Sequence, residues 1–388
     1  MKPERIVRAL LAVLALGLAA CSPASPAPAG SGAPPPTAAA RPATAPTVAP
    51  AAARPAAPAS TAQPASAAAR QPLSPRVAVR YGELGQASDA GFYVALDRGY
   101  FAEEGLDVEA IPIGSGGRMI PSLGAGQIDV GGGGISTALI NAVARDVPLR
   151  LVADKGSLRP GFGYSGLVVR KELVDRGEVQ GPADLKGRRI AVNTPTGMDV
   201  YGLDAALERG GLKLDDVALE QIGYPDMIAA LANGAVDGAT PLEPTVTAIV
   251  QQGIGVELIG FDEATPNSQL GAIMYGPQFI RDQPEAAKRF AVAYLRGIRD
   301  YNQAFTTGTG RDDVIQILTR YTTIKDPHVF ETMTVPGLNP NGYLNKESIA
   351  ATETFWQRLG LLQTTIDPDQ LVDNRYVDYA LEVLGRSP

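Results

Sequence analysis

The 388-residue chain contains one cysteine and one histidine, and this scarcity excludes several kinds of site. The cysteine is Cys21, close to the N-terminus, and the histidine is His328. Zinc clusters, disulfide frameworks, Cys–His nucleophile pairs and Ser–His–Asp triads all need these residue types within the folded part of a chain. We therefore expect no metal site and no catalytic group of these kinds.

Large apolar residues are rare in residues 22–75. This stretch has 14 proline and 21 alanine residues among its 54 positions, and Val48 and Leu73 are its only large aliphatic side chains. Such a segment cannot bury enough apolar surface to offset the entropy of ordering, so it is predicted to be disordered. Residues 76–388 are numerous enough to form two lobes around buried cores.

Basic residues are in deficit after the N-terminal stretch. The whole chain has a formal net charge of −7, whereas residues 76–388 contain 28 Lys and Arg against 40 Asp and Glu, a net charge of −12. A protein that binds nucleic acid presents a basic surface to the phosphates. We therefore expect no nucleic-acid partner.

The N-terminus has the features of an export signal. Lys2, Arg5 and Arg8 precede an apolar run of about twelve residues, which is too short to span a membrane and typical of a secretory signal. The run ends in Leu-Ala-Ala before Cys21, which resembles a bacterial lipoprotein signal. We expect a signal peptide at 1–20, a lipid on Cys21 and a disordered tether over 21–75, which would hold the protein at the extracytoplasmic face of the cell membrane.

An internal repeat organises the remainder of the chain. Three blocks recur in the same order, with offsets between 108 and 113: 76–79 with 189–192, 96–99 with 207–210, and 119–131 with 227–239. Each copy alternates short apolar runs with helical patterns, which is typical of parallel β–α–β units. The elements are expected at 77–81, 89–98, 106–113, 119–125 and 128–131 in the first copy, and at 190–193, 198–209, 217–222, 227–232 and 236–239 in the second.

The repeat predicts an α/β fold of two lobes, each a parallel-rich sheet flanked by helices. We expect 76–166 and 271–388 to form lobe 1 and 167–270 to form lobe 2. Two crossings, near 167–170 and 260–271, would form the hinge, and the C-terminal helices would pack outside lobe 1. Asp129 and Asp237 occupy equivalent positions, so a structural role at a turn is expected for both.

A binding cleft is expected where the carboxyl ends of the strands of both lobes meet. Six loops would line it: 85–91, 114–117, 131–137, 194–198, 223–226 and 240–245. Their glycine and hydroxyl residues suit close approach to a ligand, although Ser136 and Thr137 also suit helix capping. Glu243 would pair with an amine on the ligand or with a cation at the hinge, and the aromatic residues would stack on the ligand or lie in the core. The candidate ligand-binding residues are Phe92, Tyr93, Ser115, Gly116, Gly133, Ser136, Thr137, Tyr164, Thr196, Gly197, Tyr224, Glu243 and Tyr275.

Four segments resemble periplasmic solute-binding proteins of the sulfonate and thiamine-precursor type. They are GFYVALDRGYFAEEGLDV at 91–108, GQIDV at 126–130, DLKGRRIAV at 184–192 and GAVDG at 234–238. The resemblance implies a type II periplasmic-binding-protein fold. It also implies a protein, with no cofactor, that closes on a small organic nutrient and delivers it to the permease and ATPase subunits of an ABC importer. We expect a sulfonate or a thiamine-pyrimidine precursor as ligand, and a monomer.

Two other functions compete with import. The same family includes enzymes that make the thiamine pyrimidine with an active-site histidine and a cysteine cluster, but His328 lies outside the six loops and Cys21 outside the folded part. We therefore expect a protein that is not an enzyme. An extracellular ligand-sensing domain that reports to a receptor stays an open alternative.

Overall fold

A computed structural model describes residues 71–388 of the protein. The predictions for the signal peptide, for Cys21 and for nearly all of the tether lie outside the described residues. Within 71–388, no helix combines the length and the apolar character that crossing a membrane requires.

The first sheet has the strand order β2-β1-β3-β10-β4. β1, β2 and β3 pair in parallel, whereas β10 is antiparallel to both of its neighbours. Val79 and Tyr81 alternate along β1 and are fully buried, as expected for a strand that packs helices against its face. The strands are β1 (Val77–Glu83), β2 (Leu106–Pro112), β3 (Val130–Gly134), β4 (Arg150–Leu158) and β10 (Ser268–Tyr275).

The second sheet repeats this arrangement with the order β7-β6-β8-β5-β9, in which β5 is antiparallel to both neighbours. In the lobes built on these sheets, the strand–helix–strand–helix–strand order expected of each copy is confirmed. The Asp129 carboxylate accepts from the backbone N–H of Arg80 at 2.8 Å, and the Asp237 carboxylate accepts from that of Arg189 at 2.9 Å, so both acids hold equivalent turns. The strands are β5 (Gly166–Arg170), β6 (Arg189–Val192), β7 (Ala218–Gln221), β8 (Gly238–Ala239) and β9 (Gly255–Gly260).

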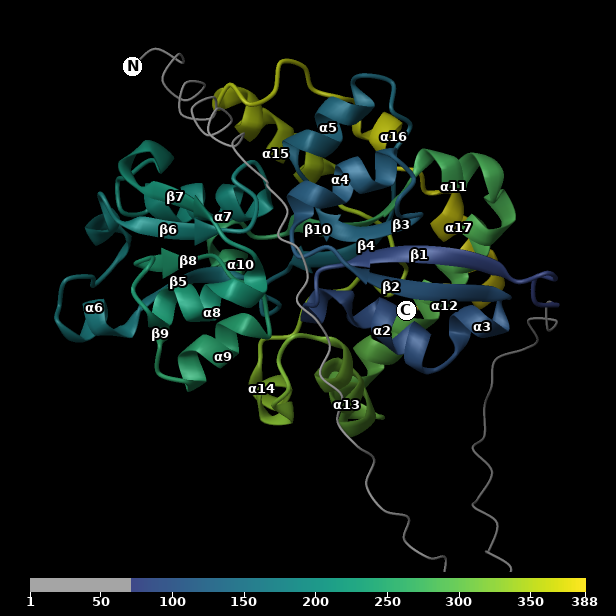
Figure 1. The fold of residues 1–388 in the computed structure, drawn as a ribbon, viewed down its shortest axis with the longest axis horizontal. Helices are drawn as coiled ribbons and strands as arrows, with labels where there is room; N and C mark the ends of the chain where they lie inside the picture. The colour runs from purple at the N-terminus through teal and green to yellow at the C-terminus, as the bar shows by residue number, and fades with distance from the viewer. Residues whose placement is uncertain (1–70) are drawn as a thin grey trace, which may run out of the picture. The chain divides into compact units, whose positions relative to one another are not determined.

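The chain passes between the two sheets twice (Figure 1). The first crossing is the segment 159–165 between β4 and β5, and the second runs from β9 through α10 (Phe261–Ala264) to β10. We expected the first crossing near 167–170. It lies just before these residues, because they are paired within β5. The expected residue boundaries of the two lobes stay a prediction.

Helices cover both sheets. In the first lobe, the long amphipathic α12 packs against α2 and α17 and buries aromatic side chains such as Phe290 and Tyr294. The helices of this lobe and of the C-terminal part are α2 (Ala90–Asp97), α3 (Tyr100–Glu103), α4 (Gly116–Gly124), α5 (Thr137–Val143), α11 (Pro277–Asp282), α12 (Pro284–Thr306), α13 (Arg311–Tyr321), α14 (Pro327–Thr332), α15 (Lys346–Arg358), α16 (Pro368–Leu371) and α17 (Arg375–Leu384). Those of the second lobe, besides α10, are α6 (Lys171–Asp175), α7 (Met198–Glu208), α8 (Tyr224–Ala232) and α9 (Thr245–Gln251); short 3₁₀ turns are η1 (Ala87–Asp89), η2 (Pro182–Leu185) and η3 (Leu214–Asp216).

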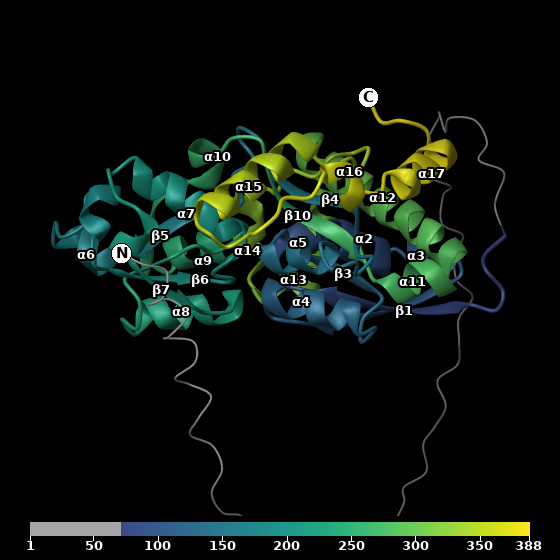
Figure 2. The same cartoon turned by 90° about the horizontal axis from the view of Figure 1, so that it is seen from above.

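The C-terminal helices contact both lobes, not only the first as we expected. α15 packs against β10 and also lies beside α7 of the second lobe (Figure 2). Arg358 at its end forms ion pairs with Asp204 at 2.6 Å and Glu208 at 3.1 Å. Likewise, α14 packs against α9. The expectation holds for α13 and α17 and is wrong for α14 and α15, because the apolar stripe of a helix shows that one face is buried but does not identify the partner.

Candidate functional site

A cavity of about 40 Å³ lies where the strand ends of the two lobes meet. Each of the six loops expected to form a cleft contributes at least one lining residue. The first lobe contributes Leu84, Ser88, Gly116, Gly133, Gly134, Ile135, Ser136, Lys155, Leu270 and Gly271. The second lobe and the first crossing contribute Tyr164, Asn193, Thr194, Gly197, Met198, Asp199, Tyr224 and Leu242.

The two lobes touch directly around this cavity. The backbone N–H of Gly116 donates to Asn193 Oδ1 at 3.2 Å, and Asn193 Nδ2 donates to the carbonyl of Gly114 at 3.3 Å. The N–H of Thr137 donates to the carbonyl of Thr196 at 3.2 Å. The cleft is therefore closed, and its cavity has room for only a few atoms. A larger molecule enters only when the lobes separate about the two crossings.

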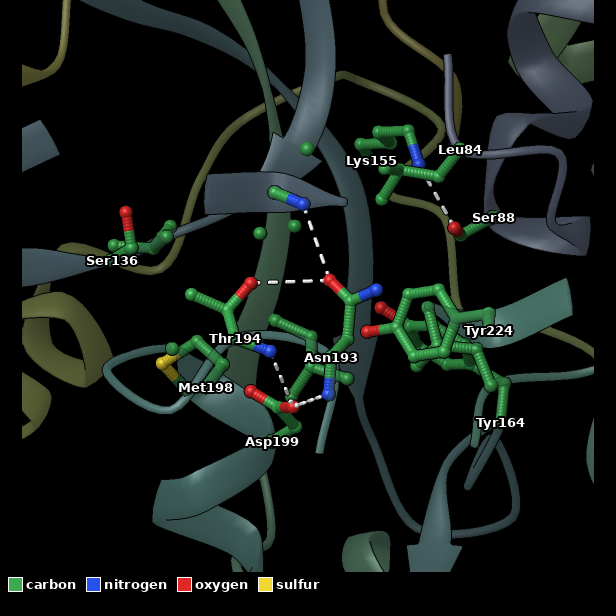
Figure 3. Close-up of a pocket in the computed structure, with 18 residues that line it drawn as sticks. Leu84, Ser88, Ser136, Lys155, Tyr164, Asn193, Thr194, Met198, Asp199 and Tyr224 are labelled. Carbon is green, nitrogen blue, oxygen red and sulfur yellow. Dashed lines mark hydrogen bonds between the residues drawn. The ribbon is translucent and has the colours of Figure 1, made fainter. Parts of the chain in front are cut away.

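Lys155 is the cation of the cavity (Figure 3). β4 contains one extra residue at this point, because Asp154 pairs with Ala272 and Gly156 with Gly271, leaving Lys155 outside the ladder. Such a bulge redirects a side chain. The buried ammonium lies 3.1 Å from Asp89 Oδ1 and donates to Ser88 Oγ at 2.9 Å. These two partners hold a charge that would otherwise be costly to bury.

Asp199 is the carboxylate that lines the cavity from the second lobe. It lies in the first turn of α7 and accepts from the backbone N–H groups of Asn193 at 2.7 Å and Thr194 at 3.1 Å. Burial raises the pKa of Asp199 to about 6, although the backbone hydrogen bonds act in the opposite direction. The carboxylate therefore fixes the loop that follows β6 and brings negative charge to the cavity near neutral pH.

Two tyrosine rings complete the wall. Tyr164 comes from the first crossing and Tyr224 begins α8, and both are buried. Burial raises the pKa of both phenols well above their ordinary value, so both stay protonated and able to donate a hydrogen bond. Each also offers an aromatic face to a ligand.

Six of the thirteen candidate residues line the cavity together: Gly116, Gly133, Ser136, Tyr164, Gly197 and Tyr224. The Ser136 hydroxyl is buried and has no hydrogen-bond partner within the part of the chain that the structure describes. Because a buried polar group without a partner is costly, a hydrogen bond from a bound ligand to this hydroxyl would be favourable.

Three aromatic candidates lie in the core of the first lobe instead. Phe92 stacks on Tyr81 with ring centroids 3.6 Å apart. Tyr93 stacks on Tyr321 and donates to Glu83. Tyr275 donates to the carbonyl of Ala287 at 2.8 Å. Their side chains point into the helical layer, which positions them away from the cavity.

The remaining four candidates border the cavity without lining it. Ser115 precedes α4, whereas Thr137 and Thr196 join the lobes through their backbones. The Glu243 carboxylate is buried and accepts from Thr247 N at 3.0 Å, Thr247 Oγ1 at 2.8 Å and Thr334 N at 3.3 Å. Burial raises the pKa of Glu243, and its protein partners leave it no direct role in the cavity.

Packing explains part of the glycine run 131–134, which lies in a loop whose glycines we expect to approach a ligand. A Cβ on Gly132 would lie 1.9 Å from the Tyr81 hydroxyl oxygen and 2.7 Å from Lys155 Cε. A Cβ on Gly131 would lie 2.7 Å from the Met119 sulfur. Only Gly133 and Gly134 line the cavity, so half of the run serves the core.

Sequence reasoning missed Lys155, Ser88, Asn193 and Asp199. The sequence around Lys155 gave no clear signal, because Arg150 interrupts the apolar residues at 149–153 and Asp154 directly precedes the lysine. A signal for Asp199 was the repeat itself, which aligns it with Asp89 at an offset of 110. Among residues 71–388, no group of three or more histidine, aspartate or glutamate side chains is placed to hold a metal ion.

Comparison with known proteins agrees with this architecture. The chain is 27% identical over 215 residues to a binding protein of Brucella abortus (strain 2308), covering 54% of this chain and 62% of the relative. It is 29% identical over 210 residues to the taurine-binding periplasmic protein of Escherichia coli (strain K12), covering 53% of this chain and 61% of the relative. The chain therefore spans less than two thirds of the length of these relatives.

Solved structures share the fold at lower identity. The periplasmic nitrate-binding protein NrtA from Synechocystis PCC 6803 aligns with a TM-score of 0.66 at 17% identity, over 80% of this chain and 89% of its own. The desulfurization enzyme DSZB aligns with a TM-score of 0.56 at 16% identity, over 79% of this chain and 99% of its own. The fold therefore occurs in binding proteins and in an enzyme.

A family model described as NMT1/THI5 like matches residues 86–303, more than half of the chain and all six cavity loops except residue 85. The match begins within the first loop and ends within α12. The chain belongs to the NMT1/THI5-like family and has the two-lobed α/β fold of its periplasmic binding proteins.

Proposed function

We propose that this protein is the solute-binding component of an ABC importer and that its ligand is a small organic nutrient held between the lobes. The observation that carries the proposal is the cavity itself. It is closed, contains an unpartnered buried hydroxyl on Ser136, and is lined by loops from both sheets. Relatives whose names describe binding proteins, taurine binding and nitrate binding support the same function.

In the proposed mechanism, a bound ligand holds the two lobes together. A ligand that contacts Lys155 from one lobe and Tyr224 from the other gains both sets of contacts only when the cleft is closed. It therefore shifts the population toward the closed form by the difference in its affinity for the two forms. The permease and ATPase subunits would receive the closed, loaded protein.

We also propose a ligand class, a monomeric state and a location for the protein. The ligand belongs to the sulfonate or thiamine-pyrimidine-precursor class, and the protein acts as a monomer outside the cytoplasm. Cys21 carries a lipid that anchors it to the membrane. Lipid labelling of the wild-type protein and of Cys21→Ser, followed by membrane fractionation, tests the anchor separately from binding.

A thermal-shift screen tests binding. Sulfonates, pyrimidine precursors of thiamine, riboflavin and nitrate are added to the wild-type protein, to Tyr224→Ala and to Tyr379→Ala, which alters a tyrosine on α17 that does not line the cavity. A ligand present at 100 times its dissociation constant adds about 2.7 kcal/mol to the free energy of unfolding. We expect a compound that stabilises wild type and Tyr379→Ala but not Tyr224→Ala. Equal stabilisation of all three proteins by every active compound would refute binding in the cavity.

A further inference from the structure

The charge of the cavity differs from that expected of an anion site. Lys155 is the one Lys or Arg side chain among the residues that line it. Its ammonium lies 3.1 Å from Asp89 Oδ1, and both side chains are almost completely inaccessible to solvent. Asp89 also accepts from the Tyr81 hydroxyl at 3.0 Å and from the N–H of Leu84 at 3.3 Å. Among residues 71–388, the one cation that lines the cavity is therefore already neutralised by a carboxylate that the protein holds in place.

A second carboxylate makes the balance negative. Asp199 lines the cavity from the other lobe, and near neutral pH it is mostly ionised because its pKa is about 6. Lys155, Asp89 and Asp199 together carry a formal charge of −1. A bound anion would bring like charges together in a buried site, where such repulsion is poorly screened.

Backbone donors do not compensate for this charge. The N–H of Gly116, at the start of α4, donates to Asn193, and the N–H of Thr137 donates to Thr196. The N–H groups of Asn193 and Thr194 donate to Asp199. These four donors at strand and helix ends are thus bonded to protein acceptors instead of an anion.

Besides the hydroxyls of Tyr164 and Tyr224, two polar groups of the cavity remain available to a ligand. The Lys155 ammonium has three N–H donors and two described partners, Asp89 and Ser88, so one donor is left. The Ser136 hydroxyl is buried without a partner among the described residues. Apolar side chains such as Leu84 and Met198 form much of the remaining wall.

We propose that the Lys155–Asp89 pair makes the cleft select an uncharged ligand, whose acceptor oxygen binds Lys155 and whose second polar group binds Ser136. The proposal rests on the proposed function and narrows its ligand class, because it disfavours sulfonates and nitrate. Lys155 is then a residue that determines specificity through its charge balance with Asp89.

Acetamide and acetate test this proposal directly. They have nearly the same shape and four non-hydrogen atoms each, but only acetate is charged at pH 7.5. At about −1.5 kcal/mol per non-hydrogen atom, the best ligands of this size reach about −6 kcal/mol, a dissociation constant of about 0.04 mM, so binding from this value into the millimolar range is suited to titration followed by NMR. We expect acetamide to bind the wild-type protein at least tenfold more tightly than acetate, and Ser136→Ala to weaken acetamide binding about threefold to tenfold.

The variant Asp89→Asn should abolish the preference. It leaves the Lys155 charge without its carboxylate, so acetate should bind at least tenfold more tightly than it binds the wild-type protein. The matched control is Lys155→Met/Asp89→Asn, in which the cavity again has no unbalanced cation and acetate gains nothing. Circular dichroism verifies that each variant folds, and should Asp89→Asn not fold, the wild-type and Ser136→Ala titrations decide alone.

Acetate binding to the wild-type protein as tightly as acetamide, or binding of neither probe, overturns the proposal. The proposed function has a separate outcome. It stands if the thermal-shift screen finds a cavity ligand of any charge, and it fails if no compound in that screen depends on Tyr224. A sulfonate found by the screen would therefore refute the charge selection and leave the import proposal intact.

Discussion

The two lobes share one topology but differ in how they hold a buried acid. Asp89 and Asp199 follow equivalent strands, lie at or next to the first turn of equivalent helices and accept hydrogen bonds from backbone N–H groups. Asp89 is paired with Lys155, whereas no ion pair involving Asp199 is found in the described part of the chain. The same turn chemistry thus gives a neutral pair in one lobe and a carboxyl group with a raised pKa in the other.

A β-bulge at equivalent places explains the difference. In β4 the residue left out of the ladder is Lys155, and in β9, where Val168 pairs with Glu257 and Leu167 with Ile259, it is Leu258. Both bulges adjoin the strand that enters from the other lobe, β10 or β5. The residue at this bulge is a lysine in the first lobe and a leucine in the second. This difference accounts for the cation that the first lobe contributes to the cavity.

The largest effect is expected when Lys155 is made to resemble its counterpart. Lys155→Leu leaves Asp89 buried without its cation, and removing one partner of a buried pair typically costs about 3–5 kcal/mol. Urea denaturation should show a loss of this size in the free energy of unfolding. The double variant Lys155→Leu/Asp89→Asn should recover at least half of it, and a single-variant loss below about 1 kcal/mol would contradict the pairing.

Asp199 should make the stability of the protein depend on pH. Its folded pKa of about 6 lies above the unfolded value for aspartate, about 3.9, so the folded state binds more protons between about pH 4 and 6. The free energy of unfolding should therefore fall by about 2–3 kcal/mol as the pH rises through this window. Asp199→Asn should remove this fall, which denaturation curves at pH 4.5 and 7 measure; a fall of unchanged size in Asp199→Asn would contradict the role of this carboxyl group.

A smaller loss of stability is expected when one of two glycines of β3 is replaced by alanine. Gly132→Ala would place its Cβ 1.9 Å from the Tyr81 hydroxyl oxygen, whereas the nearest atom to a Cβ on Gly134 is the Leu270 carbonyl oxygen at 3.7 Å. Overpacking of this kind costs about 1–3 kcal/mol. Thermal unfolding should show that loss for Gly132→Ala and a change within about 0.5 kcal/mol for Gly134→Ala. Equal losses would show that space does not distinguish the two positions.

The smallest change in stability is expected for the two arginines that pair with the equivalent turn residues Asp129 and Asp237. Arg80 donates to Asp129 through Nε at 3.0 Å and Nη2 at 2.7 Å, whereas the Arg189 Nε is 3.7 Å from Asp237. Both arginine side chains are partly exposed, so each ion pair contributes at most about 1 kcal/mol. Arg80→Ala should destabilise more than Arg189→Ala in chemical denaturation. The reverse order would show that these geometries do not control the stability of the turns.

The repeat made the fold predictable from local patterns. The order of strands and helices follows from alternating apolar runs, and Asp129 and Asp237 were recognisable because they align. The site was predictable only where it depends on loops at strand ends, as for Gly116, Ser136 and Tyr224.

Packing between residues far apart in the sequence determines the parts of the site that we could not predict. Phe92 and Tyr93 lie on α2, whose buried face is set by α12, a helix about 200 residues later in the chain. Lys155 reaches the cavity because β4 bulges where it pairs with β10, more than 100 residues away. No window of sequence around these residues contains that information, so their roles could not be assigned from local pattern alone.

Distance measurement between the lobes tests the central claim most directly. Spin labels on Arg145→Cys and Lys213→Cys, two exposed positions on opposite lobes, report the separation in a chain whose Cys21 is replaced by serine. With the ligand from the thermal-shift screen, we expect the distribution of distances to narrow and shift to shorter values, and Tyr224→Ala to prevent the shift. A distribution that stays unchanged at saturating ligand would contradict binding in a cleft that closes between two lobes.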